Sequence, residues 1–153
     1  VEFSLGMNHV RCEIGDIRFT SKLIDGKFPE YSRVVPANAT RIIDADRETL
    51  RQSLHRTAIL SNEKYRGIRL NIKPSLLTLQ AHNPEQEEAE DQIEVNYEGE
   101  EIEIGFNVTY LLDALSAIDT ARVNIALTDA NSSCLVTAAE DDGAKYVVMP
   151  MRL

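Results

Sequence analysis

The sequence predicts an α+β fold in which a strand–helix–three-strand unit occurs twice, with two helices on one face of antiparallel sheets. Residues 41–98 and residues 101–149 show the same order of expected elements, at a spacing of ~60 residues that is typical of an internal repeat. Each unit contains one stretch with the apolar period of a helix, and the stretches around it read as strands bounded by turn signals. Two helices with one apolar face each are expected to pack side by side on the sheets.

The first 40 residues contain expected strands and no helix. The strands lie at 1–5, 9–14 and 17–23, with turns at 6–8 and 15–16. They match only the last three strands of a repeat unit, which predicts that the chain starts partway through a domain. Residues 25–40 are too apolar for a flexible tether and are expected to lie against a surface.

The first complete unit begins with a strand at 41–45. Asp46 is the expected N-cap of a helix that runs to about Ser61. Its apolar stripe comprises Leu50, Leu54, Thr57 and Ser61. Strands follow at 68–72 and 76–81. An acidic loop at 85–91 then leads to a strand through alternating apolar residues: Ile93, Val95 and Tyr97.

The second unit begins with a strand at 102–105. Asn107 is the expected N-cap of the second helix. Its apolar stripe comprises Tyr110, Leu111, Ala114, Leu115 and Ile118. Three more strands are expected at 123–127, 133–137 and 144–148. Pro150 has no N–H and ends the last of them. The apolar tail beyond it either docks on its own core or offers partners an adaptable surface, since methionine repacks readily.

Composition excludes several classes of protein. The chain has 153 residues, 43% of them hydrophobic and 27% charged, as in soluble globular domains. No apolar run approaches the ~20 residues of a membrane span. The net charge of −9 argues against a surface that coats nucleic acid, although a local basic face is compatible with it. Cys12 and Cys134 are too far apart in the chain for a metal-spaced cluster and are expected to be free thiols in a reducing cytosol.

No catalytic motif is present, and no cofactor or metal is expected. The three histidines are scattered, and neither a P-loop nor a GxGxxG sequence occurs. The acidic run from Glu85 to Asp91 has carboxylates that suit a divalent cation, but a solvated loop or an ion-pair interface is the preferred interpretation. Arg47, Arg51 and His55 form a helix stripe that suits either solvent or phosphate groups.

Five segments, in the same order, closely resemble the bacterial DNA polymerase III beta subunits, the sliding clamps. They are FTSKLIDGKFPEYSRVVP from Phe19, SNEKYRG from Ser61, NPEQEEAE from Asn83, GFNVTYLLDAL from Gly105 and YVVMPMRL from Tyr146. The resemblance implies the sliding-clamp (DNA clamp) fold. It identifies residues 1–31 as the end of a middle domain plus linker, and residues 32–153 as a complete C-terminal domain.

The resemblance also implies a function. Full-length clamps are non-enzymatic processivity factors of the cytoplasm, which form head-to-tail homodimeric rings around duplex DNA. They tether the DNA polymerase III alpha subunit, the clamp loader delta subunit, and other polymerases and repair proteins through a short clamp-binding motif. Two alternatives are a stand-alone peptide-binding or inhibitory module that does not encircle DNA, and a metal-dependent enzyme that uses the acidic loop.

Site residues follow from the same resemblance. The cleft for the partner peptide is expected to contain Pro29, Arg33, Val34, Asn107, Tyr110, Ser133, Val147, Val148, Met149, Pro150, Met151, Arg152 and Leu153. The subunit interface is expected to contain Ile59, Leu60, Glu85, Glu87, Glu88 and Glu90. Arg51 and Arg56 match basic positions that face DNA.

Overall fold

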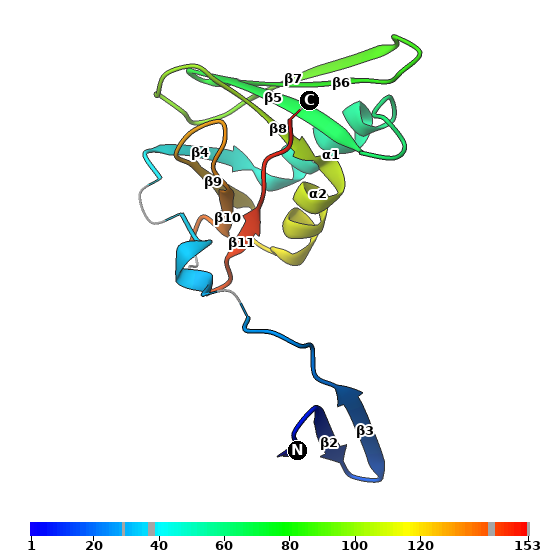
Figure 1. The fold of residues 1–153 in the computed structure, drawn as a ribbon. Coiled ribbons are helices and arrows are strands. Elements are labelled where there is room, and N and C mark those ends of the chain that lie inside the picture. Colours follow the sequence, from blue (N-terminus) through cyan, green and yellow to red (C-terminus); the bar gives the residue numbers. More distant parts are fainter. Residues whose placement is uncertain (29, 37–38, 141–142, 153) are drawn as a thin grey trace. The chain divides into compact units, whose positions relative to one another are not determined.

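The computed structural model describes residues 1–28, 30–36, 39–140 and 143–152, and the side chain of Arg33 also lies outside this description. The chain forms two compact units, an N-terminal unit (Val1–Glu30) and a C-terminal unit (Tyr31–Leu153) (Figure 1). Each unit is described separately below.

The N-terminal unit is a three-stranded antiparallel sheet. Its strands β1 (Glu2–Leu5), β2 (His9–Ile14) and β3 (Ile17–Lys22) pair in the order β1-β2-β3, close to the predicted positions. Large apolar side chains of this sheet are exposed, among them Phe3 and Phe19. A small sheet whose apolar side chains are uncovered does not build an independent core.

The C-terminal unit has the predicted repeat of strand, helix and three strands. The first repeat comprises β4 (Arg41–Asp46), α1 (Arg47–Ala58), β5 (Gly67–Lys73), β6 (Leu76–His82) and β7 (Glu88–Glu94). The second comprises β8 (Ile102–Asn107), α2 (Val108–Ala117), β9 (Arg122–Leu127), β10 (Cys134–Ala138) and β11 (Tyr146–Val148). A short 3₁₀ helix, η1 (Tyr31–Arg33), precedes both. The α+β fold class is therefore confirmed.

The two repeats exchange their first strands. One antiparallel sheet has the order β11-β10-β9-β4 and the other β7-β6-β5-β8, so each sheet takes three strands from one repeat and one from the other. Ile43 of β4 pairs with Ile125 of β9, and Leu70 of β5 pairs with Ile104 of β8. Because neither repeat completes a sheet alone, the two are expected to fold together.

The helices bury most residues of the predicted stripes. Leu50, Leu54 and Leu115 are among the largest fully buried side chains, and Phe106 at the end of β8 is the largest.

Both cysteines are free thiols. Burial raises the pKa of Cys134 to about 12, so this thiol stays protonated at neutral pH.

Three predictions about these elements were wrong. Helix α1 ends at Ala58 and not near Ser61, because the N–H groups of Ile59 and Ser61 turn to the carbonyls of Arg56 and Ala58, three residues back. Tyr110 is exposed although it was assigned to the apolar stripe, since the buried face of α2 runs through Val108, Leu111, Ala114 and Leu115 and leaves Tyr110 outside it.

The third concerns the acidic segment. Residues 88–91 form the first half of β7 and not a loop, and they pair with β6 from His82↔Glu88 to Leu79↔Asp91. Backbone pairing outweighs the low β-propensity of glutamate here, because these acidic side chains lie mainly on the exposed face of the strand. Strand β7 also ends at Glu94, three residues before the predicted end at Tyr97, and the ends of the other strands lie within two residues of their predicted positions.

Asp46 caps α1 as predicted, and its removal should cost measurable stability. Its side chain accepts a hydrogen bond from the N–H of Thr49 at 2.8 Å, and hydrogen bonding to Thr49 lowers the pKa of Asp46. We expect Asp46→Ala to reduce the free energy of unfolding at pH 7 by about 1 kcal/mol, measured by chemical denaturation followed by circular dichroism. Because the folded-state pKa is depressed, this contribution is present above the unfolded pKa of about 3.9 and is lost as pH falls through the lower, folded-state value.

The matched control is Asp46→Asn, which keeps the cap but cannot titrate. It should remain close to the wild type at pH 7. A deficit in Asp46→Ala that stays constant between pH 7 and pH 2.5 would show that the carboxylate is not the source of the effect.

Candidate functional site

The C-terminal tail bridges the two sheets of the C-terminal unit. Strand β11 pairs with β10 through Leu135↔Val147 and Cys134↔Val148, and Pro150 follows where the pairing ends. The N–H of Met151 then donates to the carbonyl oxygen of Gly105 on β8 at 2.9 Å. The tail is therefore anchored at both ends and passes close to α2 on its way (Figure 1).

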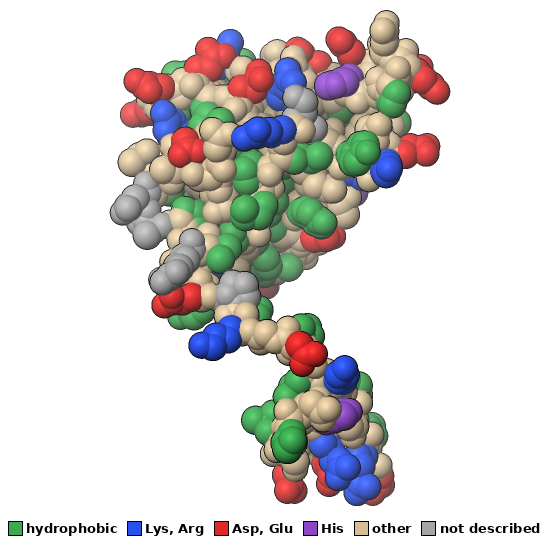
Figure 2. Space-filling model, viewed as in Figure 1, with side chains coloured by type: hydrophobic (Ala, Val, Ile, Leu, Met, Phe, Trp, Pro, Cys, Tyr) green, Lys and Arg blue, Asp and Glu red, His purple; other side chains and the backbone are tan. Residues whose placement is uncertain are grey.

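Between the two anchors the tail offers apolar side chains to solvent. Val148 is buried and Val147 half-buried, whereas 62% of Met149 is exposed. Hydrophobic side chains gather along this face of the C-terminal unit (Figure 2). Both interpretations of the tail thus hold in part: it docks on its own core through Val148, and it keeps an apolar surface through Met149. Leu153 lies outside the described residues.

The linker contributes a second side of this surface. The hydroxyl of Ser133, just before β10, donates to the carbonyl oxygen of Val34 at 3.1 Å. The N–H groups of Val34 and Val35 both bond to the carbonyl of Tyr31, which closes the turn after η1. The side chain of Val34 remains exposed. Pro29 and the side chain of Arg33 lie outside what the structure describes.

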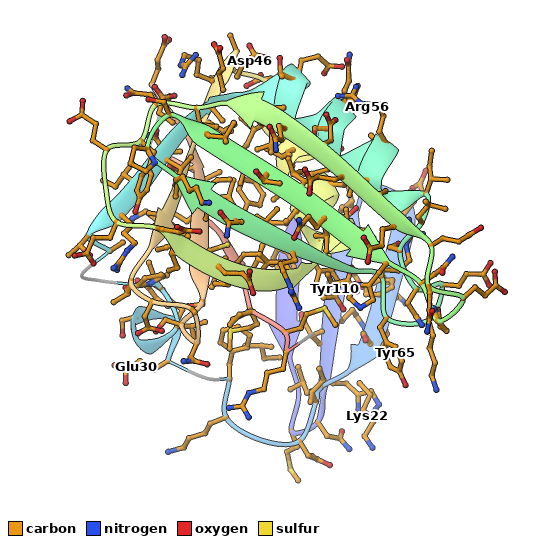
Figure 3. All side chains as sticks on the ribbon, turned by 90° about the horizontal axis from the view of Figure 1, so that it is seen from above. Lys22, Glu30, Asp46, Arg56, Tyr65 and Tyr110 are labelled. Carbon is orange, nitrogen blue, oxygen red and sulfur yellow. The ribbon has the colours of Figure 1, made fainter. Side chains whose placement is uncertain are left out.

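Helix α2 provides Asn107 and Tyr110. The side-chain oxygen of Asn107 caps the helix by accepting from the N–H of Thr109 at 2.9 Å, and its amide nitrogen donates to the carbonyl oxygen of Tyr65 at 3.2 Å. Asn107 therefore holds the α1–β5 loop in place as well as starting α2. The ring of Tyr110 is exposed in the first turn of the helix (Figure 3).

Val34, Tyr110 and Met149 come from three different elements and present exposed apolar surface. We assign these residues and β11 to one candidate surface for a partner peptide, since Ser133 ties Val34 to the start of β10, the strand that pairs with β11, and we call this candidate surface the tail groove. An extended peptide is recognised by such a surface when apolar pockets take its side chains and anchored backbone sets its position.

A cavity that the sequence did not predict lies where the tail ends. It has a volume of ≈ 410 Å³, and we call it the tail cavity. Its lining comes from three segments: the α1–β5 loop and the first residue of β5 with Asn62, Tyr65 and Gly67, the end of β6 and the turn after it with Gln80, His82, Asn83 and Pro84, and the tail with Met151 and Arg152. The SNEKYRG and NPEQEEAE segments had already stood out in the sequence, but nothing in the linear order indicated that they meet.

Both cations assigned to DNA contact are already paired with carboxylates. Arg51 forms two hydrogen bonds with Glu48, at 2.8 and 3.0 Å, and those from Arg51 and Gln52 lower the pKa of Glu48 to about 2. Arg56 donates two hydrogen bonds to one oxygen of Asp91 on β7, at 2.6 and 3.0 Å. Burial opposes the ionisation of Asp91, but hydrogen bonding, chiefly from Arg56, outweighs it and lowers the pKa of Asp91.

The residues assigned to the subunit interface occupy one edge of the C-terminal unit. Ile59 follows the last turn of α1 and is 77% exposed, while Leu60 is half-buried. Helix α1 packs against β7, which is the terminal strand of its sheet and carries Glu88 and Glu90. Glu85 and Glu87 lie in the turn before it, where the amide of Asn83 donates to Glu87 at 2.7 Å. Exposed charge on a terminal strand discourages unspecific pairing with other chains.

The acidic segment does not resemble a metal site. Within residues 1–28, 30–36, 39–140 and 143–152, no three histidine, cysteine, aspartate or glutamate residues are grouped so that they could hold a metal ion. Neither of the two described α-helices is long and apolar enough to cross a membrane.

The chain is similar to proteins of one family over nearly its whole length. Residues 32–152 match the family model of the DNA polymerase III beta subunit, C-terminal domain. A beta sliding clamp from Pseudomonas aeruginosa is 56% identical over 149 residues, which are 97% of this chain and 41% of that protein. The crystal structure of a DNA polymerase III subunit beta from the same organism superposes with a TM-score of 0.91 over 99% of this chain and 42% of that one.

A third comparison concerns a ligand complex. A sliding clamp from Pseudomonas aeruginosa solved with griselimycin bound shares 56% identity and a TM-score of 0.88, over 99% of this chain and 41% of that chain. The chain thus spans about two fifths of the length of the relatives that it matches.

Proposed function

Since this chain belongs to the DNA polymerase III beta subunit family, and has the sliding-clamp fold, we propose that it acts as the C-terminal part of a processivity clamp that tethers replication partners through the tail groove. Family membership agrees with the prediction that the chain has no catalytic activity of its own. The proposed partners are the polymerase III alpha subunit, the clamp loader delta subunit and other polymerases and repair proteins of the cytoplasm that carry a clamp-binding motif.

The anchored tail is the observation that carries this proposal. A tail without a binding role needs no second attachment beyond Val148, yet Met151 bonds to Gly105 on the other sheet and leaves Met149 exposed between the two anchors. Ser133 and Asn107, assigned to the same site, hold the neighbouring segments at Val34 and Tyr65. Pro29, Arg33 and Leu153 belong to the proposed groove on the strength of the sequence resemblance.

Titration calorimetry with a clamp-motif peptide tests the proposal. The peptide is expected to bind this chain at one site, and griselimycin, which a relative at 56% identity binds, is expected to compete with it. A peptide that carries the same residues in scrambled order serves as the control. Equal binding of the two peptides would refute recognition of the motif.

The ring is the second part of the proposal. We assign residues 1–31 to the end of a middle domain and its linker, and residues 32–153 to a C-terminal domain. The exposed apolar side chains of the N-terminal sheet support this assignment, because further strands of a middle domain would cover them. In the closed ring that we propose, α1 faces duplex DNA. The edge of the C-terminal unit that contains Ile59 and β7 contacts the next subunit.

Because Arg51 and Arg56 of α1 are paired with carboxylates, we expect α1 to bind DNA weakly. Asp91 occupies two of the five N–H donors of Arg56 and offsets its charge, so it competes with a phosphate for this guanidinium. In the full-length clamp we expect Asp91→Asn to free this guanidinium and to steepen the dependence of log K on log salt concentration by up to about 0.9 for each new phosphate contact. Fluorescence anisotropy with a labelled duplex over a salt series measures the slope.

Glu103→Gln is the matched control for that experiment. It removes the same charge from β8, where Glu103 lies 3.6 Å from Arg69, and β8 is at the opposite edge of the sheet from β7. An equal change of slope in both variants would attribute the effect to net charge and would contradict the role of Arg56.

A second candidate function is a peptide-binding or inhibitory module that does not encircle DNA. The C-terminal unit favours this candidate, because it has a hydrophobic core of its own and contains the residues of the tail groove without the N-terminal sheet. Light scattering and an intact-mass measurement of the protein isolated from cells separate the candidates. A dimer of clamp length supports the ring, and a monomer of this chain's mass supports the module.

A further inference from the structure

We propose that Arg56 and Asp91 form a switch that couples two surfaces of the clamp, the face of α1 that meets phosphate groups and the edge strand β7. A cationic partner surface that engages Asp91 releases Arg56 for a phosphate, and a phosphate that engages Arg56 releases Asp91 for the partner. This inference rests on the proposed ring and extends it, because contact with DNA and contact with the next subunit then favour each other.

The two residues belong to different surfaces. Arg56 is in the last turn of α1, and 58% of its side chain is exposed. Asp91 is on β7, the terminal strand of its sheet, and 27% of its side chain is exposed. Arg56 lies at the edge of the C-terminal unit where α1 packs against β7 (Figure 3). Each side chain thus remains accessible from its own surface while it is bonded to the other.

Asp91 has an unusual position for a carboxylate. Because side chains alternate along a strand, Asp91 shares the face of β7 with the buried Ile93, whereas Glu88 and Glu90 lie on the opposite, exposed face. A carboxylate on the partly buried face needs a partner, since an unpaired charge there is costly. Arg56 is that partner, with two hydrogen bonds at 2.6 and 3.0 Å.

The geometry of the pair allows exchange. Both hydrogen bonds from Arg56 end on Oδ2 of Asp91, while Oδ1 accepts from the N–H of Gln92 at 2.9 Å. Arg56 therefore does not form the fork over both carboxylate oxygens that is strongest for arginine. Ion pairs with this degree of exposure are weak, so a competing charge can replace either member.

The charge of the edge selects the partner. Four further carboxylates are exposed in β7 and in the turn before it: Glu85, Glu87, Glu88 and Glu90. Glu90 accepts from the side-chain amide of Gln80, which does not offset its charge, whereas Arg56 offsets that of Asp91. An edge of this composition fits a cationic surface. Release of Arg56 adds a fifth carboxylate of the same sign and increases the complementarity.

A purely structural role of the pair predicts the opposite result. If Arg56 and Asp91 only held β7 against α1, removal of either residue would loosen the edge and weaken the dimer. In the switch, Arg56 competes with the partner for Asp91, so removal of Arg56 strengthens the dimer. The sign of the effect therefore separates the two roles.

Sedimentation velocity of the labelled full-length clamp, with fluorescence detection at low protein concentration, tests the inference. Low salt is used because salt screens exposed charges. We expect Arg56→Gln to lower the dimer dissociation constant about threefold and Asp91→Asn to raise it about threefold. The double variant should match Asp91→Asn, because the gain from Arg56→Gln requires the Asp91 carboxylate.

Arg51→Gln is the matched control. It removes the same charge from the same helix, but Arg51 is paired with Glu48 of α1 and not with β7. Its dimer should be as stable as that of the wild type. An equal gain in Arg51→Gln, or a gain from Arg56→Gln that persists when Asp91 is already Asn, would attribute the effect to net charge and overturn the switch.

The outcomes also separate the switch from the ring. If the wild type dimerises and Arg56→Gln weakens the dimer or leaves it unchanged, the pair only holds β7 in place, and the proposed ring is unaffected. If the wild type forms no dimer at any concentration, the proposed ring fails and the switch fails with it.

Discussion

Deletion of residues 149–153 is expected to weaken the binding of a clamp-motif peptide at least a hundredfold, to below detection in a calorimetric titration of this chain. The deletion removes the exposed Met149 and the Met151 anchor on β8 together, and hence one whole side of the tail groove. A hundredfold weaker affinity is a loss of about 2.7 kcal/mol in binding free energy, which is typical when a main apolar anchor of a binding site is removed.

The fold itself should survive this deletion. The missing segment contributes one backbone hydrogen bond to the described structure of the C-terminal unit, whose net contribution is about 1 kcal/mol, and the core residue Val148 stays. Circular dichroism and thermal unfolding verify that the truncated chain is folded. Undiminished peptide affinity in a folded, truncated chain would rule out the tail groove as the binding site.

A pair of methionine variants refines the result. Met149→Ala should weaken peptide binding by about tenfold, since it removes one apolar contact. Met7→Ala is the matched control, because Met7 is a fully exposed methionine in the turn between β1 and β2 of the N-terminal unit. Equal effects of the two substitutions would point to an unspecific hydrophobic contribution.

Local patterns in the sequence predicted most of the secondary structure of this chain. The stripe through Leu50 and Leu54, and the caps Asp46 and Asn107, are visible in the linear order because helices are organised by contacts between residues three or four apart. The end of α1 was harder to predict. It depends on bonds from Ile59 and Ser61 that compete closely with a further helical turn.

Long-range pairing explains what the sequence did not reveal. The exchange of β4 and β8 between the repeats joins residues about 80 and 35 positions apart, as in Ile43↔Ile125 and Leu70↔Ile104, and no periodicity encodes the choice of partner. The glutamates of β7 show the same effect, since β6 imposes a strand on residues with low β-propensity.

The candidate site, too, could be predicted from the sequence only in part. Resemblance assigned residues to a groove, and the structure shows which contacts hold many of them, such as Ser133 on Val34. The tail cavity was missed because Tyr65, His82 and Met151 come together only through the tertiary fold. The pairing of Arg56 with Asp91 was missed for the same reason, since 35 residues separate the two.

Replacement of Ile59 and Leu60 by lysine is expected to dissociate the dimer of the full-length clamp. Ile59 is a large apolar side chain that is 77% exposed at the end of α1, beside the acidic edge strand β7. The family resemblance places the basic surface of a neighbouring subunit opposite this edge. Two lysines would be buried without partners against a surface of the same charge. We therefore expect the free energy of dimerisation to weaken by about 2–4 kcal/mol, or roughly 30- to 1,000-fold in the dimer constant.

Helix α1 should tolerate these lysines, so the loss can be attributed to the interface. Both positions follow the last turn of α1, where cations interact favourably with the helix dipole. Because Leu60 is half-buried, Ile59→Lys alone is the second variant, and it should keep most of the effect. Sedimentation velocity over a range of protein concentrations measures the dimer constant, and circular dichroism verifies the fold.

Ile42→Lys separates an interface effect from a general effect of surface charge. Ile42 is 55% exposed on β4, in the sheet that does not contain β7, so lysine there adds the same charge at a site outside the proposed interface. We expect its dimer to be as stable as that of the wild type. If Ile59→Lys leaves the dimer intact while Ile42→Lys dissociates it, the subunits meet through the β11-β10-β9-β4 sheet, and the edge formed by α1 and β7 must then serve another purpose.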